Sequence, residues 1–479
     1  MPPQPYQMYI NGAWTHAQSG ETFETLDPAT EEVIGVVPRG QAADIDRAVA
    51  AARAAFEGPW GRLLPKRRAR LLYDLARAIE ANVDELAQLE TRDQGKPITQ
   101  SRRDVLGSAR YFEFYAGAAD KLMGETIPTG PDYLHLTQRE PLGVTAHIVP
   151  WNFPLNMLAR SLAPALAAGN TAVVKPAEQT PLTALRLAGL IDAVGFPAGV
   201  YNVVTGFGEE AGAPLSTHPG IDGITFTGSV EVGRLIMRAA AEHIKPVVLE
   251  LGGKSPHIIF ADADLDLAVA EAAKGIYTNC GQVCSAGSRL VVQASIKDRF
   301  LQQLRQRALQ MSVGPGLDAP DLGPLTSREH YERVLGYIDL GQQEGARLYA
   351  GGTRPPELPR GYFVQPTIFD EVQPAMRIAQ EEIFGPVLSV LSFQDEAEAL
   401  HIANNVPYGL VAGIFTNDIN RALRLANGIK AGQVYVNEYF ATSEEVPFGG
   451  YKQSGFGREK GLEALKHYTQ VKAISIRLR

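Results

Sequence analysis

The chain has 479 residues, of which 45% are hydrophobic and 20% charged, with a formal net charge of −8 at pH 7. This length allows about three domains, and the composition is that of a globular chain with a sizeable core. The acidic balance and the lack of a dense Lys/Arg run argue against nucleic acid as a partner. No segment approaches about 18 consecutive apolar residues, so we expect no membrane partner.

The N-terminal stretch and the cysteine usage predict a compartment. Met1–Ile10 contains three prolines and no apolar core, so we expect a soluble protein without a signal peptide. Cys280 and Cys284 lie too close together in a long chain to form a disulfide framework, which favours a reducing, cytoplasmic setting. The nine histidines are scattered and form no HExxH pattern, and no CxxC pair occurs, so we expect no metal.

The first elements in chain order are helical. Apolar residues at helical spacing predict a helix over Asp44–Phe56 with Asp44 as its N-cap. A longer helix is predicted over about Pro65–Gln94.

Between Gly143 and Phe260 short runs rich in Val, Ile and Thr alternate with helical stretches. This alternation predicts a parallel sheet with crossover helices, and such sheets bind ligands outside the carboxyl ends of their strands. The predicted strands are Gly143–Val149, Thr171–Val174, Gly199–Val204, Gly223–Phe226 and Val247–Leu251, and the helices between them are Asn156–Ala168, Pro181–Val194 and Val230–Ala241. The polar or glycine residues that follow these strands are Trp151-Asn152, Lys175 to Glu178, Gly206 and Gly208, Gly228-Ser229, and Glu250.

A second alternating region, from Leu265 to about Val436, indicates a second α/β lobe. Its predicted helices are Asp266–Tyr277, Lys297–Ser312 and His330–Gly345, and its predicted strands are Val387–Phe393, Val411–Phe415 and Gly432–Val436. Two segments stand apart: the hairpin-like Lys121–Thr137 and the alternating tail Thr469–Leu478. Isolated strands need a partner edge, so we expect these two to pair with each other or with a neighbouring subunit.

Cys284 is the most informative residue. A thiol in a Gly-rich turn can approach a carbonyl closely, and a carboxylate such as Glu250 can serve as its base, although a free Cys is more often a small buried hydrophobe. Gly206, Gly208 and Gly212 form either a phosphate loop or tight turns, because their spacing is a weak signal.

Two other stretches suggest a dinucleotide. Thr227-Gly228-Ser229, between a strand and a helix, is better placed for a diphosphate than the glycines described above. Lys175 and Glu178 could hydrogen-bond a ribose or form a surface pair.

Taken together these pieces resemble the aldehyde dehydrogenase superfamily over nearly the entire chain. The stretches that carry the resemblance are Pro150-Trp151-Asn152-Phe153-Pro154, Lys175-Pro176-Ala177-Glu178, Phe226-Thr227-Gly228-Ser229, Leu249-Glu250-Leu251-Gly252-Gly253-Lys254, Gly281-Gln282-Val283-Cys284, Glu381-Glu382-Ile383-Phe384-Gly385-Pro386 and Pro447-Phe448-Gly449-Gly450. The resemblance implies an α/β fold: a Rossmann-like dinucleotide-binding domain (1–118 and 139–252), a second α/β catalytic domain (253–455) and small β oligomerisation segments (119–138 and 460–479). It also implies a homodimer or homotetramer.

The resemblance implies NAD(P)-dependent oxidation of an aldehyde to the acid through a Cys thiohemiacetal and thioester. Cys284 is then the nucleophile, Asn152 and the backbone N–H of Cys284 the oxyanion donors, and Glu250 the base. Glu459 matches a position proposed to relay protons, although the relay lysine of the family is replaced here by Ser161. Alternatively, Glu459 is an ordinary carboxylate at a helix N-terminus. Cys280 is either a free thiol without a role or a partner that bridges Cys284 under oxidation.

The implied cofactor is NAD in preference to NADP, because Glu178 would repel a 2′-phosphate; NADP remains possible. The residues implied to contact it are Val149, Trp151, Lys175, Glu178, Gly208, Gly228, Ser229, Leu251, Glu382 and Phe384.

The aldehyde itself is the open question. The positions implied to line the substrate tunnel are Phe153, Met157, Arg160, Val283, Ser285, Phe440 and Thr442. Relatives that oxidise succinic semialdehyde hold its carboxylate with an Arg at the spacing of Arg160. Those relatives also have a second Arg, and its position in this chain is occupied by Thr278. Either the substrate is a carboxylated semialdehyde, or it is neutral and Arg160 is paired internally. Three other classes are less well supported. Glu250 argues against a CoA-acylating dehydrogenase, which needs no hydrolytic base, and the lack of a nearby His argues against a cysteine hydrolase. The retained Cys284 and Asn152 argue against a non-enzymatic descendant of the fold.

Overall fold

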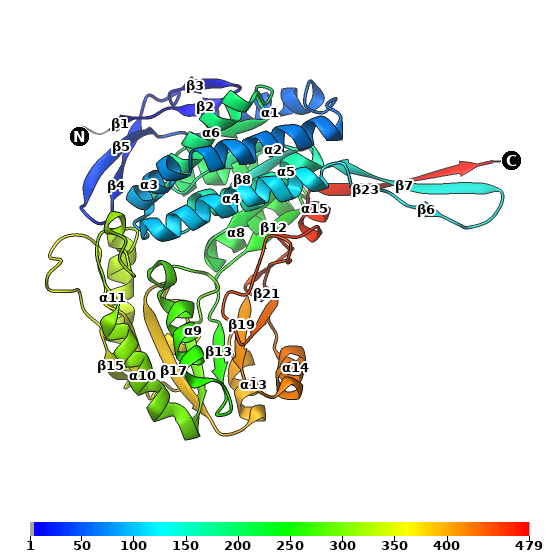
Figure 1. Ribbon diagram of the computed structural model, residues 1–479. Helices are drawn as coiled ribbons and strands as arrows, with labels where there is room; N and C mark the ends of the chain where they lie inside the picture. Colours follow the sequence, from blue (N-terminus) through cyan, green and yellow to red (C-terminus); the bar gives the residue numbers. More distant parts are fainter. Residues whose placement is uncertain (1–3, 479) are drawn as a thin grey trace.

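The computed structural model describes residues 4–478. The chain forms two lobes, each built around its own sheet, and a thin arm that projects from the upper lobe (Figure 1). None of the helices in residues 4–478 is long and apolar enough to cross a membrane.

The first lobe contains an eight-stranded sheet in the order β22-β12-β11-β8-β9-β10-β2-β3. Its five central strands are parallel and buried, as their continuous apolar runs predict. All five strands predicted between Gly143 and Phe260 are confirmed, with ends shifted by one or two residues. The strands are β2 (Met8–Ile10), β3 (Ala13–Thr15), β8 (Val144–Ile148), β9 (Thr171–Lys175), β10 (Tyr201–Val203), β11 (Gly223–Thr227), β12 (Val247–Glu250) and β22 (Gly455–Phe456).

Helices cover both faces of this sheet (Figure 1). They are α1 (Ala42–Glu57), α2 (Pro65–Ala81), α3 (Val83–Gln94), α4 (Ile98–Ala118), α5 (Pro154–Ala168), α6 (Leu182–Val194), α7 (Ala213–Thr217) and α8 (Val230–Ala241). The prediction of one helix over Pro65–Gln94 is wrong, because the backbone of Asn82 leaves the helical region and separates α2 from α3. Asp44 is not the N-cap of α1: Gln41 is, and the Asp44 carboxylate accepts a hydrogen bond from the backbone N–H of Gln41.

The second lobe contains a seven-stranded sheet in the order β15-β16-β17-β14-β13-β19-β20. All the helices and strands predicted for this region are found. Four short strands, β13 to β16, and three helices, α12 to α14, were not predicted. The strands are β13 (Pro256–Ile259), β14 (Arg289–Gln293), β15 (Arg347–Ala350), β16 (Thr367–Asp370), β17 (Val387–Phe393), β19 (Val411–Phe415) and β20 (Gln433–Val436), and the helices are α9 (Leu265–Tyr277), α10 (Lys297–Gln310), α11 (Arg328–Gln343), α12 (Arg377–Gln380), α13 (Glu396–Asn404) and α14 (Ile419–Gly428).

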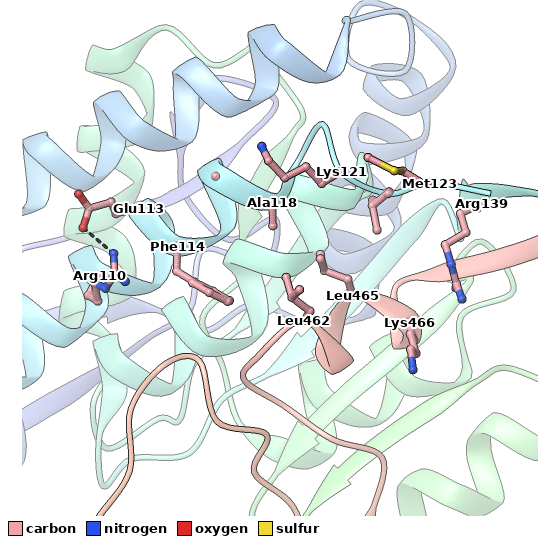
Figure 2. A pocket seen from close by; sticks show the side chains of 12 residues that line it. Arg110, Glu113, Phe114, Ala118, Lys121, Met123, Arg139, Leu462, Leu465 and Lys466 are labelled. Carbon is pink, nitrogen blue, oxygen red and sulfur yellow. Dashed lines mark hydrogen bonds and ion pairs between the residues drawn. The ribbon is translucent and has the colours of Figure 1, made fainter. Parts of the chain in front are cut away.

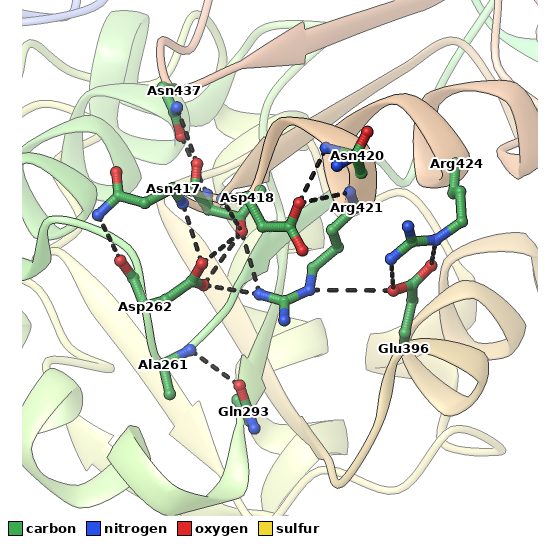
Figure 3. A network of polar contacts seen from close by, with 11 residues as sticks. Ala261, Asp262, Gln293, Glu396, Asn417, Asp418, Asn420, Arg421, Arg424 and Asn437 are labelled. Atoms are coloured by element: carbon green, nitrogen blue, oxygen red, sulfur yellow. Dashed lines mark hydrogen bonds and ion pairs between the residues drawn. The ribbon is translucent and has the colours of Figure 1, made fainter.

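A polar network joins α13 and α14 to the end of β13 (Figure 3). Asp262 accepts hydrogen bonds from Arg421 (2.8 Å) and from Thr416 (2.9 Å), and Arg424 pairs with Glu396 (2.7 Å). Half-exposed ion pairs of this kind each contribute about 1 kcal/mol or less, so their main effect is to fix the positions of the two helices.

The arm is a three-stranded antiparallel sheet in the order β23-β7-β6, formed by β6 (Thr126–Ile127), β7 (Tyr133–Pro141) and β23 (Thr469–Arg477). β23 pairs with β7 at nine successive positions, so the expected pairing of the tail with the 121–137 segment is confirmed. The remaining elements are β1 (Gln4–Pro5), β4 (Thr22–Asp27), β5 (Glu32–Pro38), β18 (Tyr408–Gly409), β21 (Tyr451–Lys452) and α15 (Glu463–His467).

Candidate active site

The carboxyl ends of five neighbouring strands, in the order β12-β11-β8-β9-β10, form one edge of the first sheet. Strands lie about 4.8 Å apart, so this edge extends about 19 Å, a length that suits an extended dinucleotide. The strand order reverses between β8 and β11, and the crevice at such a reversal is where parallel sheets bind ligands. Trp151 follows β8, and Gly228 and Ser229 follow β11, where the Ser229 hydroxyl caps α8.

Cys284 lies in a tight turn, in which the N–H of Ala286 donates to the carbonyl of Val283 over 3.0 Å. Gly281 and the two residues before it have positive φ, a conformation that is strained for non-glycine residues. A Cβ on Gly281 would lie 2.1 Å from the carbonyl oxygen of Gly385, so only glycine allows this close contact between the two motifs. No residue in the described range 4–478 accepts a hydrogen bond from the backbone N–H of Cys284.

The Asn152 side chain lies beside the nucleophile loop. Its Nδ2 donates to the carbonyl of Gln282 over 2.9 Å, and its backbone carbonyl accepts from Asn279 over 2.9 Å. One N–H of the Asn152 amide is therefore held by the loop, and the second remains for another acceptor.

Glu250 ends β12 and is 2% exposed. Neither of its carboxylate oxygens has a hydrogen-bond partner within residues 4–478. Burial raises the pKa of Glu250 well above its usual value, and the nearby Glu459 raises it further, while Arg160 opposes the shift. Burial also raises the pKa of the Cys284 thiol to about 12. Burial therefore disfavours the charged form of both groups.

A cavity of about 190 Å³ brings these residues together with most of the predicted cofactor contacts. Its lining includes Asn152, Met157, Glu250 and Cys284, together with Trp151, Gly228, Ser229, Leu251, Glu382 and Phe384. Val149, Lys175, Glu178 and Gly208 do not line it.

Three of these four residues lie further along the same sheet edge. Val149 donates its N–H to the carbonyl of Lys175 over 3.1 Å, and the buried Lys175 ammonium pairs with Glu178 at 2.8 Å. Gly208 begins a π-helical turn, Gly208–Gly212, that continues into α7, so this part of the glycine stretch is helical rather than a series of tight turns.

The loops around Glu250 and Glu382 are in direct contact. A Cβ on Gly252 would lie 2.0 Å from a Glu382 carboxylate oxygen, and the N–H of Gly253 donates to that carboxylate over 3.0 Å. Burial raises the pKa of Glu382 to about 7.

Sequence reasoning missed two residues that line the same cavity, His330 and Arg333, both on α11. The His330 ring packs on Trp151 at 5.0 Å, and its Nε2 donates to the carbonyl of Phe384 over 2.7 Å. Burial lowers the pKa of His330 to about 4, so the ring is neutral. Arg333 donates to the carbonyl of Glu382 over 3.1 Å. Neither residue lies in a recognisable motif, so the sequence carries no signal for them.

The predicted tunnel residues lie in several settings around Cys284. Met157 lines the cavity, and Phe440 packs with Cys284 on a buried aromatic cluster. The Phe153 ring lies 4.1 Å from the Lys96 ammonium, and Thr442 accepts a hydrogen bond from Lys460 over 3.3 Å. Val283 and Ser285 are buried in the nucleophile loop.

Arg160 and Glu459 form a buried ion pair, with each side chain 3% exposed. Glu459 precedes α15 and pairs by its backbone with Phe448, so the interpretation of Glu459 as a helix N-terminal carboxylate is wrong.

A second cavity, of about 520 Å³, lies at the base of the arm, and Cys284 does not line it (Figure 2). Its apolar lining includes Phe114, Leu122, Met123 and Leu465, between the C-terminal end of α4 and α15.

The comparisons with known proteins agree with this geometry. The sequence model described as "Aldehyde dehydrogenase family" matches residues 14–474. The chain is 48% identical to an aldehyde dehydrogenase of Emericella nidulans, covering 99% of this chain and 96% of that one. It is 50% identical to a hydroxyisobutyraldehyde dehydrogenase of Mycolicibacterium austroafricanum, with coverage of 99% and 94%. The NAD+ complex of an aldehyde dehydrogenase from Bacillus cereus superposes with a TM-score of 0.98 at 48% identity, covering 99% of this chain and 97% of that one.

The family match spans nearly the whole chain, and the structural match extends over both lobes. The predicted fold class and enzyme class, NAD(P)-dependent oxidation of an aldehyde, are confirmed. The chain belongs to the aldehyde dehydrogenase family.

Proposed function

We propose that this enzyme oxidises an aldehyde to the carboxylic acid through covalent attachment to Cys284. The observation that carries the proposal is that Cys284, Asn152 and Glu250 line one cavity together with six of the predicted cofactor contacts. The thiol is half-buried and its N–H is not hydrogen-bonded within residues 4–478, as a nucleophile beside an oxyanion site requires.

The first step is attack of the Cys284 sulfur on the aldehyde carbon. The pKa of about 12 makes the thiol a poor nucleophile unless its proton is removed, and Glu250 is the nearby carboxyl that can take it. The carbonyl oxygen becomes an alkoxide, which the free N–H of Asn152 and the backbone N–H of Cys284 stabilise.

The second half of the reaction releases the acid. Bound NAD(P) supplies the chemistry of accepting a hydride from the thiohemiacetal carbon. Glu250 then removes a proton from a water molecule, which attacks the thioester on Cys284 and frees the carboxylic acid and the thiol. The unpaired carboxylate oxygens of Glu250 are available for this water.

We infer that the cofactor is NAD in preference to NADP. The donor set fits a dinucleotide: the N-terminus of α8 for the diphosphate, and Lys175, Glu178 and Glu382 for ribose hydroxyls. The Lys175 ammonium is already paired with Glu178, which leaves the carboxylate facing any 2′-phosphate and favours NAD. NAD+ bound to the Bacillus cereus relative supports the same inference.

The experiment combines an aldehyde panel with two cysteine variants. Wild type, Cys284→Ala and Cys280→Ala are mixed with NAD or NADP and no CoA, and the absorbance of the reduced nicotinamide is followed. Cys284→Ala should keep less than about a tenth of the wild-type turnover but still bind NAD, because the thiol forms the covalent bond. Cys280→Ala is the matched control, since Cys280 is a buried thiol that does not line the cavity, and it should retain turnover. Turnover by Cys284→Ala, or dependence on CoA, would exclude the proposal.

We also infer a homodimer or homotetramer that uses the arm. β23 is an edge strand of the arm sheet, and Val471 and Ile476 on it are 57% and 44% exposed. Met123 and Leu462 beside the apolar cavity at the arm base are 73% and 62% exposed. Exposed apolar side chains on an unpaired strand edge favour association with another chain.

A further inference from the structure

The ion pair between Arg160 and Glu459 lies beside the proposed base. Arg160 projects from α5, and its guanidinium carbon lies 4.9 Å from the centre of the Phe448 ring. Glu459 is held in place by two backbone hydrogen bonds with Phe448, of 2.7 and 2.8 Å. The pair is therefore fixed between α5 and the C-terminal segment, and it is almost fully buried.

Glu250, at the end of β12, lies beside the segment that holds this pair: a Cβ on Gly449, the residue after Phe448, would lie 2.8 Å from the Oε1 of Glu250. Four charged groups act on its carboxyl: Glu459, Arg160, Arg458 and Lys460. Arg458 donates to the backbone carbonyls of Gly450 and Gly457, and Lys460 donates to Thr442. Among these three cations, Arg160 alone forms an ion pair with Glu459, the second carboxylate of the cluster.

We propose that Arg160 is a positioning residue: its guanidinium holds Glu459 in the buried ion pair and so leaves Glu250 able to carry a negative charge. This inference rests on the proposed function of Glu250. It assigns the Arg160 guanidinium to an internal ion pair and not to the binding of a substrate carboxylate. A buried guanidinium already compensated by Glu459 has little to gain from a second anion. The substrate class that follows is a neutral aldehyde.

The direction of each effect follows from the charges. Without Arg160, two buried carboxyls would face each other, so the pKa of Glu250 would rise. Without Glu459, the remaining cations would lower the pKa of Glu250. Arg160 also lowers the pKa of the Cys284 thiol, against the larger effect of burial, so its loss should slow thiolate formation.

Other titratable groups face the cluster and limit the useful pH range. They are Tyr111 and Tyr115 on α4, Glu444 before Phe448, and Tyr468 after α15. Burial raises the pKa of each of the three tyrosines, so they stay neutral. Burial lowers the pKa of Lys460 to about 8, so the test uses the acidic limb of the profile, below that pH.

The test compares Arg160→Met, Arg160→Lys, Glu459→Gln and the double variant Arg160→Met/Glu459→Gln. The acidic limb of the kcat profile for a neutral aldehyde should move up by about 1–2 pH units in Arg160→Met. In Glu459→Gln it should move down, and Arg160→Lys and the double variant should return to within about half a unit of wild type. Alkylation of Cys284 by iodoacetamide near neutral pH should slow about 3- to 10-fold in Arg160→Met and recover in Arg160→Lys.

Three outcomes would overturn the inference. The first is a shift of the acidic limb in the same direction in Arg160→Met and Glu459→Gln, and the second is no shift in either variant. The third is a rise in KM of Arg160→Met for succinic semialdehyde alone, with the KM for a neutral aldehyde of similar length unchanged. If Arg160→Met does not fold, the downward shift of Glu459→Gln and the unshifted double variant, which buries no unpaired charge, still decide the question. The alkylation rate needs no aldehyde turnover, so failure of the proposed function and failure of this inference are distinguishable.

Discussion

Cys284 and Glu250 lie where their charged forms are poorly hydrated, and this sets what each can do. The thiol has a pKa of about 12 and the carboxyl a pKa well above its usual value, both because of burial. The raised pKa of each group disfavours its charged form, and only the charged carboxylate can take the thiol proton. Catalysis therefore depends on ionising Glu250, and turnover should rise with pH as that carboxyl loses its proton.

Replacing Glu250 with Gln should separate the two halves of the reaction. The amide cannot accept a proton from water, so the thioester on Cys284 should persist, and turnover should fall by about 10²-fold or more. Intact-mass measurement should then detect the acyl adduct, with about one equivalent of reduced nicotinamide formed in a burst.

The matched control is Glu57→Gln, at the exposed end of α1, which should behave as wild type. Turnover of Glu250→Gln within a few-fold of wild type would mean that Glu250 is not the base. Loss of both burst and adduct would show that Glu250 also deprotonates the thiol.

At the same scale, the sequence could predict most residues of the site but not all their partners. Cys284, Glu250 and Asn152 lie in short motifs, and the structure brings all three to one cavity. The Arg160–Glu459 pair joins residues about 300 positions apart, and His330 lies in an ordinary helix start, so no local pattern indicates either. Long-range pairing depends on the fold and is absent from any single stretch of sequence.

At the scale of elements, the buried central strands were predicted best, whereas α4, which has 21 residues and is the longest helix in the described range 4–478, was not predicted. The five central strands of the first sheet and helix α8 were predicted to within a few residues. β13 and β16 have four residues each and were missed, although β12 is equally short and was predicted, so a short apolar run is an ambiguous signal. The break between α2 and α3 depends on the backbone at Asn82, which hydrophobic spacing does not report.

The nucleophile loop allows a test at this scale. Gly281 has φ of +72°, and a Cβ there would meet the backbone of Gly385 at 2.1 Å. Gly281→Ala should lower the free energy of unfolding by about 1–3 kcal/mol or more and displace Cys284, so that turnover and alkylation of the thiol both fall.

Gly345→Ala is the matched control, because Gly345 has φ of +91° with nothing within 4 Å of the added Cβ. It should show only the conformational cost of about 1 kcal/mol, measured by thermal or chemical unfolding, and keep full turnover. Equal losses in the two variants would mean that the contact with Gly385 does not position the nucleophile.

At the scale of the whole molecule, the arm is the feature that a single chain does not explain. It projects from the body as a thin sheet with little beneath it (Figure 1). β7 is paired with β23 along its whole length, whereas β6 pairs at only two positions, and no described strand pairs with the outer edge of β23 over residues 469–476. A long strand edge of this kind is normally protected or used for association.

Charged substitutions on β23 should therefore reduce assembly without unfolding the subunit. Val471→Lys and Ile476→Lys alter opposite faces of the strand, and both side chains are already exposed in the single chain, so the β7 pairing should survive. Light scattering at micromolar concentration should show a smaller assembly than wild type, while alkylation of Cys284 continues. Leu309→Lys, an equally exposed apolar position (62%) on α10, is the control and should leave the assembly unchanged. A wild-type mass for both β23 variants would show that the arm is not the surface that joins subunits.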